Sequence, residues 1–386
     1  MKHPIAAKRL ILPLAIAALS APLATTSHAV PAAISEGKVL ADFRLRYESH
    51  DTDNANKTGE ALTLRSRVGV ESGDVSGFKL LVEFEDIQAL VDDYAPEKTG
   101  YDLVADPADS ELNRLQVSYA KDEFSAVVGR QRILLDNTRF VGNVGWRQNE
   151  QTYDAIKLGY KSGAYNAQYI FIDQVNDIQF KSPDVSHHLL NVNYSGFKPG
   201  SLTGYAYLLK DDATDAKNDT FGARFSGKQA VNDLSVIYTA EYALQKTDDF
   251  DASYLALEGG VVVKGITLAA GYENLGSDGG AYGFQTPLAT KHAFNGWADK
   301  FLVTQNDGLT DTYVKVATAV SGINLLAFYH DYGSDEGSAD KGSEINFQAT
   351  KGFGKNYTAG LKYAAYSKGD AGADTDKAWL WVEAKF

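Results

Sequence analysis

Apolar residues recur at every second position in segment after segment of this chain, and this period constrains the fold more than any other feature. In KVLADFRLRYE one parity carries Val, Ala, Phe, Leu and Tyr, whereas the other carries Asp, Arg and Glu. The same separation recurs in ALTLRSRVGVE and in YTAGLKYAAY. An α-helix would scatter these residues around its circumference, but a β-strand places each set on one face. The sequence therefore predicts an all-β fold.

The length of these segments and of the connections between them separates a membrane barrel from a soluble sandwich. The segments run about 9 to 11 residues, which is the length that a tilted strand needs to cross a bilayer. Short connections lie near 72–77, 120–123, 161–163, 195–200, 227–231, 263–265, 320–322 and 353–356. Longer, acidic connections lie near 49–60, 89–110, 134–150, 173–185, 210–219, 245–252, 276–308, 333–342 and 368–376. Short and long connections alternate, so the pattern predicts a closed antiparallel transmembrane β-barrel of 18 strands with short periplasmic turns and long extracellular loops.

The C-terminal segment KAWLWVEAKF supports the same fold. It alternates, and it ends with Phe386 on the apolar parity. Backbone polar groups must all be paired in lipid, so we expect residues 38–48 to pair with residues 377–386 and close the sheet. A terminal aromatic residue is typical of chains handed to the outer-membrane assembly machinery. We therefore expect that machinery, outer-membrane lipid and lipopolysaccharide as partners.

The N-terminus has the layout of a secretory signal peptide in residues 1–29. A basic start with Lys2, Lys8 and Arg9 precedes a short apolar stretch, and Ser27 and Ala29 place small residues before the expected cleavage point. We expect residues 30–386 to form one barrel domain in the outer membrane of a Gram-negative cell.

Composition excludes several other classes of protein. The chain has no Cys, which rules out disulfides, thiolate metal sites, a Cys nucleophile and a lipoprotein anchor. Without the leader, 34 basic residues face 50 acidic ones, and the net charge of −16 argues against nucleic acid as a partner. DTDNAN begins like a calcium loop but lacks the required ligands. His187 and His188 beside Ser186 have no orienting third group, so we expect neither catalysis nor a metal or cofactor.

The arginines are concentrated in the first part of the mature chain. Nine of ten lie between Arg44 and Arg147, and six of them form three R-x-R pairs. These pairs are Arg44 with Arg46, Arg65 with Arg67, and Arg130 with Arg132. A spacing of two puts both members on one face, and for the first two pairs the opposite face is apolar, so they are expected to point into the lumen. The third pair lies in FSAVVGRQRILL, where alternation is weaker, and is also assigned inward.

Carboxylates share the inward parity in the neighbouring segment LLVEFED, where Glu83 and Glu85 oppose apolar residues. Guanidinium rows are therefore expected beside carboxylates on the lumen wall. Such a wall either selects a passing solute by its transverse field or consists of mutually neutralising pairs that solvate the lumen. Both interpretations stay open at this point.

The connection FVGNVGWRQNEQTYD, residues 140–154, differs from the Asp-, Ser- and Lys-rich loops around it. Its glycines allow tight turns, and Trp146 needs a surface to pack on. We expect this third long loop to fold inward and narrow the pore as its selectivity element. In this arrangement Arg139, Arg147, Asn149 and Glu150 would be held in hydrogen bonds.

Several segments resemble, in order, those of the alginate-export family of outer-membrane barrels. They are DFRLRYE, LTLRSRVGVESGD, LVEFEDIQAL, VADPADSELNRLQVSY, VGRQRILLDNTRFVGNVGWRQNEQTYDA and TPLATKHAFNGWADKF. The resemblance implies a monomer-like barrel of the predicted size. It also implies an electropositive, Arg-lined pore that passes an anionic uronate polymer.

Three functions follow as hypotheses. The first is a passive outer-membrane channel, or porin, for the transport of hydrophilic solutes, with the arginines favouring anionic or sugar-acid cargo. The second is an exporter of alginate or another acidic polysaccharide. The third, from another class, is a structural or adhesive barrel plugged by its own loops.

Overall fold

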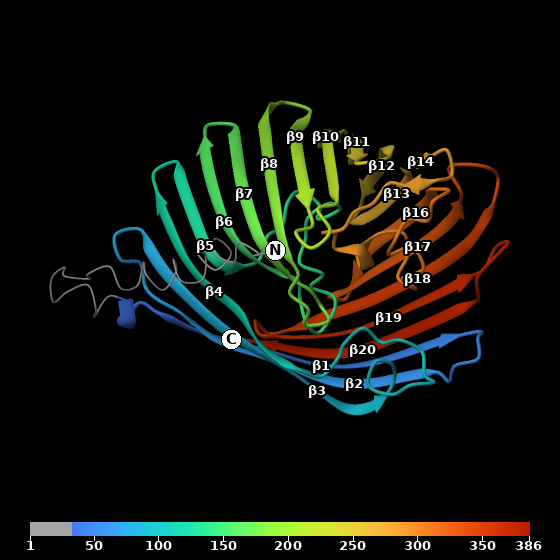
Figure 1. Cartoon of the computed structure of the whole chain (residues 1–386), viewed down its shortest axis with the longest axis horizontal. Coiled ribbons are helices and arrows are strands. Elements are labelled where there is room, and N and C mark those ends of the chain that lie inside the picture. Colours follow the sequence, from blue (N-terminus) through green and yellow to red (C-terminus); the bar gives the residue numbers. More distant parts are fainter. Residues whose placement is uncertain (1–32) are drawn as a thin grey trace, which may run out of the picture.

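A computed structural model describes residues 33–386 and places them in one closed antiparallel barrel (Figure 1). The sheet has 18 strands, as the spacing of connections predicted. The expected signal peptide, residues 1–29, lies outside the described residues. The barrel strands are β1 (Lys38–Thr52), β2 (Gly59–Glu71), β3 (Phe78–Asp93), β4 (Ser110–Lys121), β5 (Phe124–Gln131), β6 (Thr152–Ser162), β7 (Tyr165–Asn176), β8 (Asp184–Phe197), β9 (Gly200–Lys210), β10 (Lys217–Val231), β11 (Leu234–Thr247), β12 (Asp251–Val263), β13 (Ile266–Leu275), β16 (Leu309–Val320), β17 (Ile323–Gly333), β18 (Asp340–Phe353), β19 (Tyr357–Ser367) and β20 (Thr375–Lys385).

Each strand pairs with its neighbours in sequence, and β1 pairs with β20 to close the ring. At this seam the backbone N–H of Phe386 donates to the carbonyl of Ala41 (2.8 Å), and the N–H of Ala41 donates back (3.2 Å). The predicted pairing of the first and last segments is therefore confirmed, and the sheet has no free edge there.

The two faces of the strands follow the period-two pattern. On the outer face Val68, Val70 and Phe84 are 49%, 54% and 60% exposed, which suits a surface that faces lipid. On the inner face the alternate residues are buried. Opposed residues confirm the register: Leu45 lies opposite Leu64 on the outside, and Arg44 lies opposite Arg65 on the inside.

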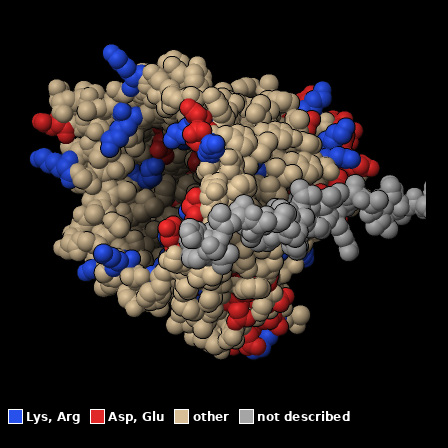
Figure 2. All heavy atoms as spheres, turned by 90° about the vertical axis from the view of Figure 1, so that its left-hand side faces the viewer, with Lys and Arg blue, Asp and Glu red and all other residues tan. Residues whose placement is uncertain are grey.

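Short turns lie on the same side of the barrel as the start of β1 and the C-terminus, and the long loops lie on the other side (Figure 1). Some strands extend further than the sequence predicted, because β1 continues to Thr52 and β3 to Asp93. On the side of the short turns a hollow opens into the barrel, and acidic and basic side chains lie at its mouth (Figure 2). No helix among residues 33–386 is long and apolar enough to cross a membrane.

Two long loops fold into the barrel and touch one another. The β5–β6 loop (residues 132–151) crosses inside the ring of strands (Figure 1). The β13–β16 loop (residues 276–308) contains the short strands β14 (Ser277–Asp278) and β15 (Tyr282–Gly283) and the 3-10 turn η1 (Lys291–Ala293). Val141 forms an isolated bridge with Leu288, and the backbone N–H of Gly142 donates to the Leu288 carbonyl at 2.8 Å. The interior is thus a packed layer of two loops rather than an open tube.

Candidate functional site

The arginines of β1 and β2 lie on the inner face, as predicted. Arg44, Arg46, Arg65 and Arg67 are only 6%, 1%, 1% and 4% exposed. The β5–β6 loop covers them, so they contact protein rather than an open lumen. Guanidinium groups buried to this extent need partners for their charge and their donors.

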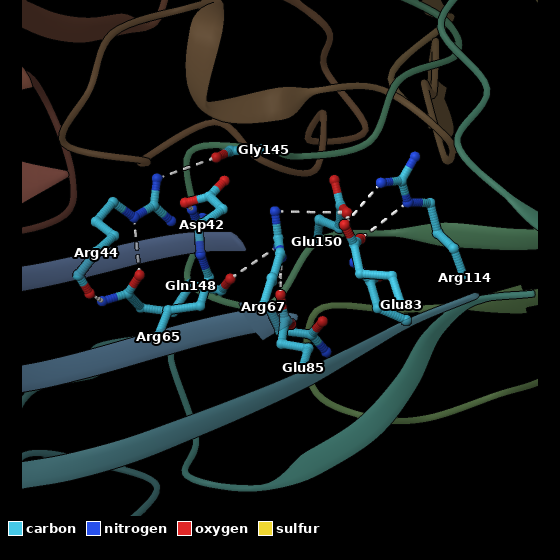
Figure 3. Close-up of polar contacts among 12 residues, drawn as sticks. Asp42, Arg44, Arg65, Arg67, Glu83, Glu85, Arg114, Gly145, Gln148 and Glu150 are labelled. Carbon is cyan, nitrogen blue, oxygen red and sulfur yellow. Dashed lines mark hydrogen bonds and ion pairs between the residues drawn. The ribbon is translucent and has the colours of Figure 1, made fainter. Parts of the chain in front are cut away.

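Arg44 binds the loop through uncharged groups. Its Nε donates to Oε1 of Gln148 (2.8 Å), and its two terminal nitrogens donate to the carbonyls of Gly145 (3.3 Å) and Arg147 (Figure 3). Gln148 in turn donates from Nε2 to the hydroxyl of Thr63 (2.8 Å) on β2. Arg44 therefore positions the loop backbone directly.

Glu150 forms the charged anchor of the loop beside β2 and β3. Nε of Arg132 donates to it at 2.6 Å, the amides of Asn113 and Asn143 donate at 2.8 and 2.7 Å, and Arg67 lies within 3.5 Å (Figure 3). Burial alone would raise the pKa of Glu150, but the charges of Arg67 and Arg132 and these hydrogen bonds outweigh burial and lower its pKa to about 2. Glu150 is therefore ionised at neutral pH.

The two predicted carboxylates on β3 are also paired. Glu83 accepts both ends of the Arg114 fork, at 2.8 and 2.7 Å, and Glu85 pairs with Arg67, which lies opposite it in the register (Figure 3). Glu83 and Glu85 are 4% and 2% exposed. In this region the neutralising interpretation of the charged wall fits the contacts.

Arg147 at the tip of the loop joins three separate parts of the chain. It donates to Glu48 on β1 (3.0 Å) and to Asp299 in the β13–β16 loop (2.8 Å). It also lies 3.6 Å from Asp106 in the β3–β4 loop (residues 94–109), and Asp106 pairs with Arg46. The side chains of Glu48 and Asp106 are each 1% exposed, so these charges are held out of water.

Trp146 packs on residues far away in sequence. Its ring stacks on His292 at 5.0 Å and meets Trp379 and Trp381 of β20 edge-on at 5.7 and 5.3 Å. Lys362 of β19 lies over the ring of Trp146 at 3.6 Å from the centroid, a cation–π contact. Burial lowers the pKa of His292 to about 3 despite the neighbouring Asp299, so this ring is neutral at pH 7.

The remaining predicted residues are divided between the two loops and the wall. Arg139 donates to Glu273 (2.6 Å) and to Asn295 (3.0 Å), and Asn149 donates to the carbonyl of Asp177 (3.1 Å). The predicted inward folding of the loop and its hydrogen bonds agree with this geometry.

Arg130 does not join the cluster around Glu150. It pairs with Asp154 of β6 at 2.7 Å, directly opposite in the register. Gly129, with a φ of 113°, interrupts the alternation just before it. Of the third R-x-R pair, only Arg132 therefore contacts Glu150.

Sequence reasoning missed several partners of the predicted residues. Glu48 shares the parity of Arg46, and the alternation placed it on the polar face, but it was not predicted as a partner of Arg147. Asn113 lies at an irregularity between β3 and β4, where the alternation fails. Asp106 and Asp299 lie in acidic or irregular loops, where nothing local distinguishes them from exposed residues.

The loop layer leaves two cavities. The outer cavity has a volume of about 610 Å³ and reaches His50 and Lys377 at the outer ends of β1 and β20. The inner cavity, about 290 Å³, lies against the walls of β10 to β17. Residues 291 and 292 line the outer cavity, whereas residues 293 to 295 line the inner one. The segment around η1 is therefore the partition between them.

The histidines and the serine considered from the sequence make separate contacts in the described part of the chain. Within residues 33–386 no three His, Cys, Asp or Glu side chains are grouped so that they could hold a metal ion. Ser186 donates to Asp212 (2.9 Å), whereas His187 accepts the N–H of Lys210 (3.1 Å) and His188 contacts the Tyr169 hydroxyl (2.8 Å).

Comparison with known structures supports the barrel architecture. OccAB3 of Acinetobacter baumannii superposes with a TM-score of 0.72 at 15% identity, covering 92% of this chain and 100% of that one. OccK9 (OpdG) of Pseudomonas aeruginosa gives 0.71 at 16% identity, with 92% and 100% covered. OpdK of Pseudomonas aeruginosa, solved with vanillate, gives 0.70 at 14% identity, with 90% and 98% covered. At these identities the likeness shows a common fold.

Sequence comparison identifies the family. No curated protein matches the chain significantly. The family model for alginate export, however, matches residues 37–291, which is well over half of the chain and includes both the charged wall and the β5–β6 loop. The residues that suggested the resemblance thus lie mostly within this match, and the chain belongs to the alginate-export family.

Proposed function

We propose that the protein is a passive outer-membrane channel for small anionic solutes, exported to that membrane by a cleaved leader at residues 1–29. The observation that carries this proposal is the pair of loops packed inside the barrel, which leaves a cavity rich in cations on the outer side. Loops that narrow a wide barrel select solutes by size and charge. A positive cavity raises the local concentration of anions and speeds their entry without an energy source.

The predicted charged residues take two different parts in this mechanism. The arginines of β1 and β2, with Glu83, Glu85 and Glu150, fix the β5–β6 loop at the constriction. We assign solute contact to the groups that line the two cavities, among them Arg147. The charged residues of the wall therefore mainly hold the loop in place, whereas the basic side chains of the cavity attract the solute.

Planar-bilayer recording of the purified full-length protein tests the proposal. We expect stable single channels whose reversal potential in a KCl gradient shows preference for chloride over potassium. The preference should weaken at high ionic strength, because the Debye length falls from about 10 Å at 0.1 M salt to about 3 Å at 1 M. Cation preference would contradict the proposal, and complete absence of conductance would favour the loop-plugged structural or adhesive barrel.

Export of an acidic polysaccharide is the second candidate, and the family match favours it. Export requires the polymer to pass the loop layer in an extended form, so the loops would have to move aside. Uronate oligomers added on the side of the short turns test this directly. Blocks of the channel current whose duration increases with oligomer length, and which end when the oligomer crosses the membrane, would support export. Brief current blocks whose duration does not depend on oligomer length would support a channel for small solutes.

A further inference from the structure

Two lysines in the outer cavity lack a carboxylate partner. The Lys291 side chain is half-buried and makes no hydrogen bond or ion pair with any residue in the described part of the chain. Lys300 donates only to the Thr375 hydroxyl (3.0 Å) and the Ala373 carbonyl (3.4 Å). By contrast, Lys377 in the same cavity pairs with a carboxylate at 3.0 Å. Lys300 also lies over the Tyr366 ring at 5.2 Å from the centroid, so within the described part of the chain neither lysine has a carboxylate in direct contact.

The cavity as a whole has a surplus of positive charge. Its lining holds four basic side chains and two carboxylates, and Glu48 behind the lining also pairs with Arg147, so the surplus lies on Lys291 and Lys300. The cations are Arg147, Lys291, Lys300 and Lys377, and the carboxylates are Asp177 and Asp299. This surplus lies in a chain whose mature charge is strongly negative, so it is a local feature of the cavity.

Both carboxylates already have partners of their own. Asp299 pairs with Arg147 at 2.8 Å and with Lys377 at 3.0 Å. Asp177 accepts the backbone N–H groups of residues 179 and 181 at 2.8 and 2.9 Å. Neither can neutralise the two unpaired lysines without losing these contacts.

Burial lowers the pKa of Lys291, with Arg139 adding to the effect, and burial likewise lowers the pKa of Lys300. For Lys300 the charge of Lys377 adds to burial, and the more distant carboxylates Glu344, Asp102 and Asp374 offset it only in part. An anion placed beside either lysine would offset that cost.

Apolar side chains line the same cavity and are exposed. Leu103, Leu302 and Val303 are 48%, 40% and 65% exposed, and all three lie in loops. They belong to the lining of the cavity, so the lipid that covers the outer faces of the strands does not cover them. Exposed apolar groups that converge on a cavity favour a ligand with an apolar surface.

We propose that the outer cavity is a binding site for small amphipathic carboxylates, with an aromatic or aliphatic body and one anionic group. Lys291 and Lys300 supply the charge for the carboxylate, and Leu103, Leu302 and Val303 contact the body. The volume of about 610 Å³ is within the range of pockets that hold small molecules. Sugar acids fit less well, because their hydroxyls would lose water against apolar side chains.

This inference rests on the proposed channel function, since it names the solute class of the same pathway. The experiment measures the concentration at which added solute half-saturates the current through single channels of the full-length protein. The probes are benzoate, glucuronate and uncharged benzyl alcohol. We expect benzoate to bind at least about tenfold more tightly than glucuronate, and benzyl alcohol to have no measurable effect.

Two double variants separate the contributions of charge and apolar contact. Lys291→Gln with Lys300→Gln should weaken benzoate and glucuronate binding alike, by roughly tenfold, because each loses charged hydrogen bonds. Leu302→Ser with Val303→Ser should weaken only benzoate, by about tenfold. Lys368→Gln is the control, because it removes one positive charge from an exposed outer-side lysine that does not line the cavity.

Equal affinity for benzoate and glucuronate in an anion-selective wild-type channel would overturn this inference and leave the channel function intact. The same holds if both double variants behave like the Lys368→Gln control. A wild-type protein that carries no anion current would overturn both proposals. If a double variant does not assemble, the wild-type comparison of the three probes still decides.

Discussion

Replacement of Arg147 by Met tests whether buried ion pairs hold the β5–β6 loop at the constriction. The change removes a cation that is 5% exposed and lies 3.0 Å from Glu48 and 2.8 Å from Asp299. Methionine keeps much of the side-chain volume, so the main loss is the charge. Glu48, Asp106 and Asp299 then stay buried with fewer compensating partners.

Removing one partner of a buried ion pair costs about 3 to 5 kcal/mol. A loss of about 4 kcal/mol lowers the ratio of docked to undocked loop by roughly a thousandfold, since each 1.4 kcal/mol corresponds to a factor of ten. Glu150, Gln148 and Trp146 still hold the loop, so we expect it to undock in bursts rather than permanently. Each burst should appear as a step to a larger conductance with weaker selectivity.

Single-channel recordings of Arg147→Met and of a control, Arg224→Met, check this expectation. Arg224 pairs with the buried Glu241 at 2.8 Å on β10 and β11, and its hydrogen bonds go to wall residues rather than to the β5–β6 loop. The control should therefore keep one stable conductance level. If Arg147→Met also shows a single level equal to that of the wild type, the loop is not held by its ion pairs and the reasoning fails.

Three further predictions concern the same loop and the barrel seam. The pKa of Glu150 is lowered from 4.5 to about 2, so the docking energy it contributes is fully present above pH 4.5 and is lost as the pH falls through 2. Conductance bursts in the wild type should increase over that acid range, whereas Glu150→Gln should show them already at pH 7 and change little on acidification. Trp146→Leu removes the stacking on His292 and the cation–π contact with Lys362, about 1 to 2 kcal/mol each at most, and should raise the burst frequency less than Arg147→Met does. Phe386→Ser should lower the amount of barrel recovered from outer-membrane fractions, while the conductance of assembled channels stays unchanged, because Phe386 is 60% exposed at the seam.

The architecture followed from the sequence because a strand fixes the faces of its residues locally. Alternation alone placed Arg44 and Arg65 inward and Val68 outward, and the alternation of connection lengths gave the strand number. The alternation does not predict the contacts of Arg130, because the positive φ of Gly129 interrupts the period of two just before it. The inward loop was predicted from its composition, because Trp146 required a packing surface.

The partners of that loop could not be predicted in the same way. Asp106 and Asp299 lie in loops without any period, and Arg147 is separated from Asp299 by 152 residues of chain. The cavity lysines were equally hidden, because the absence of a partner is a property of the folded arrangement. Nothing in the sequence distinguishes Lys291 and Lys300 from Lys377. Only the structure shows that Lys377 pairs with a carboxylate and that the other two do not.

The contacts of Trp146 and Arg147 also imply an order of events during biogenesis. Trp146 packs on β19 and β20, and Arg147 pairs with β1 and with the β13–β16 loop. These surfaces come together only after the last strand has been added and the β1–β20 seam has closed. Contacts so distant in sequence form late, because loop-closure entropy opposes them until the intervening chain is organised. The ring of strands would therefore close first, and the β5–β6 loop would dock inside it last.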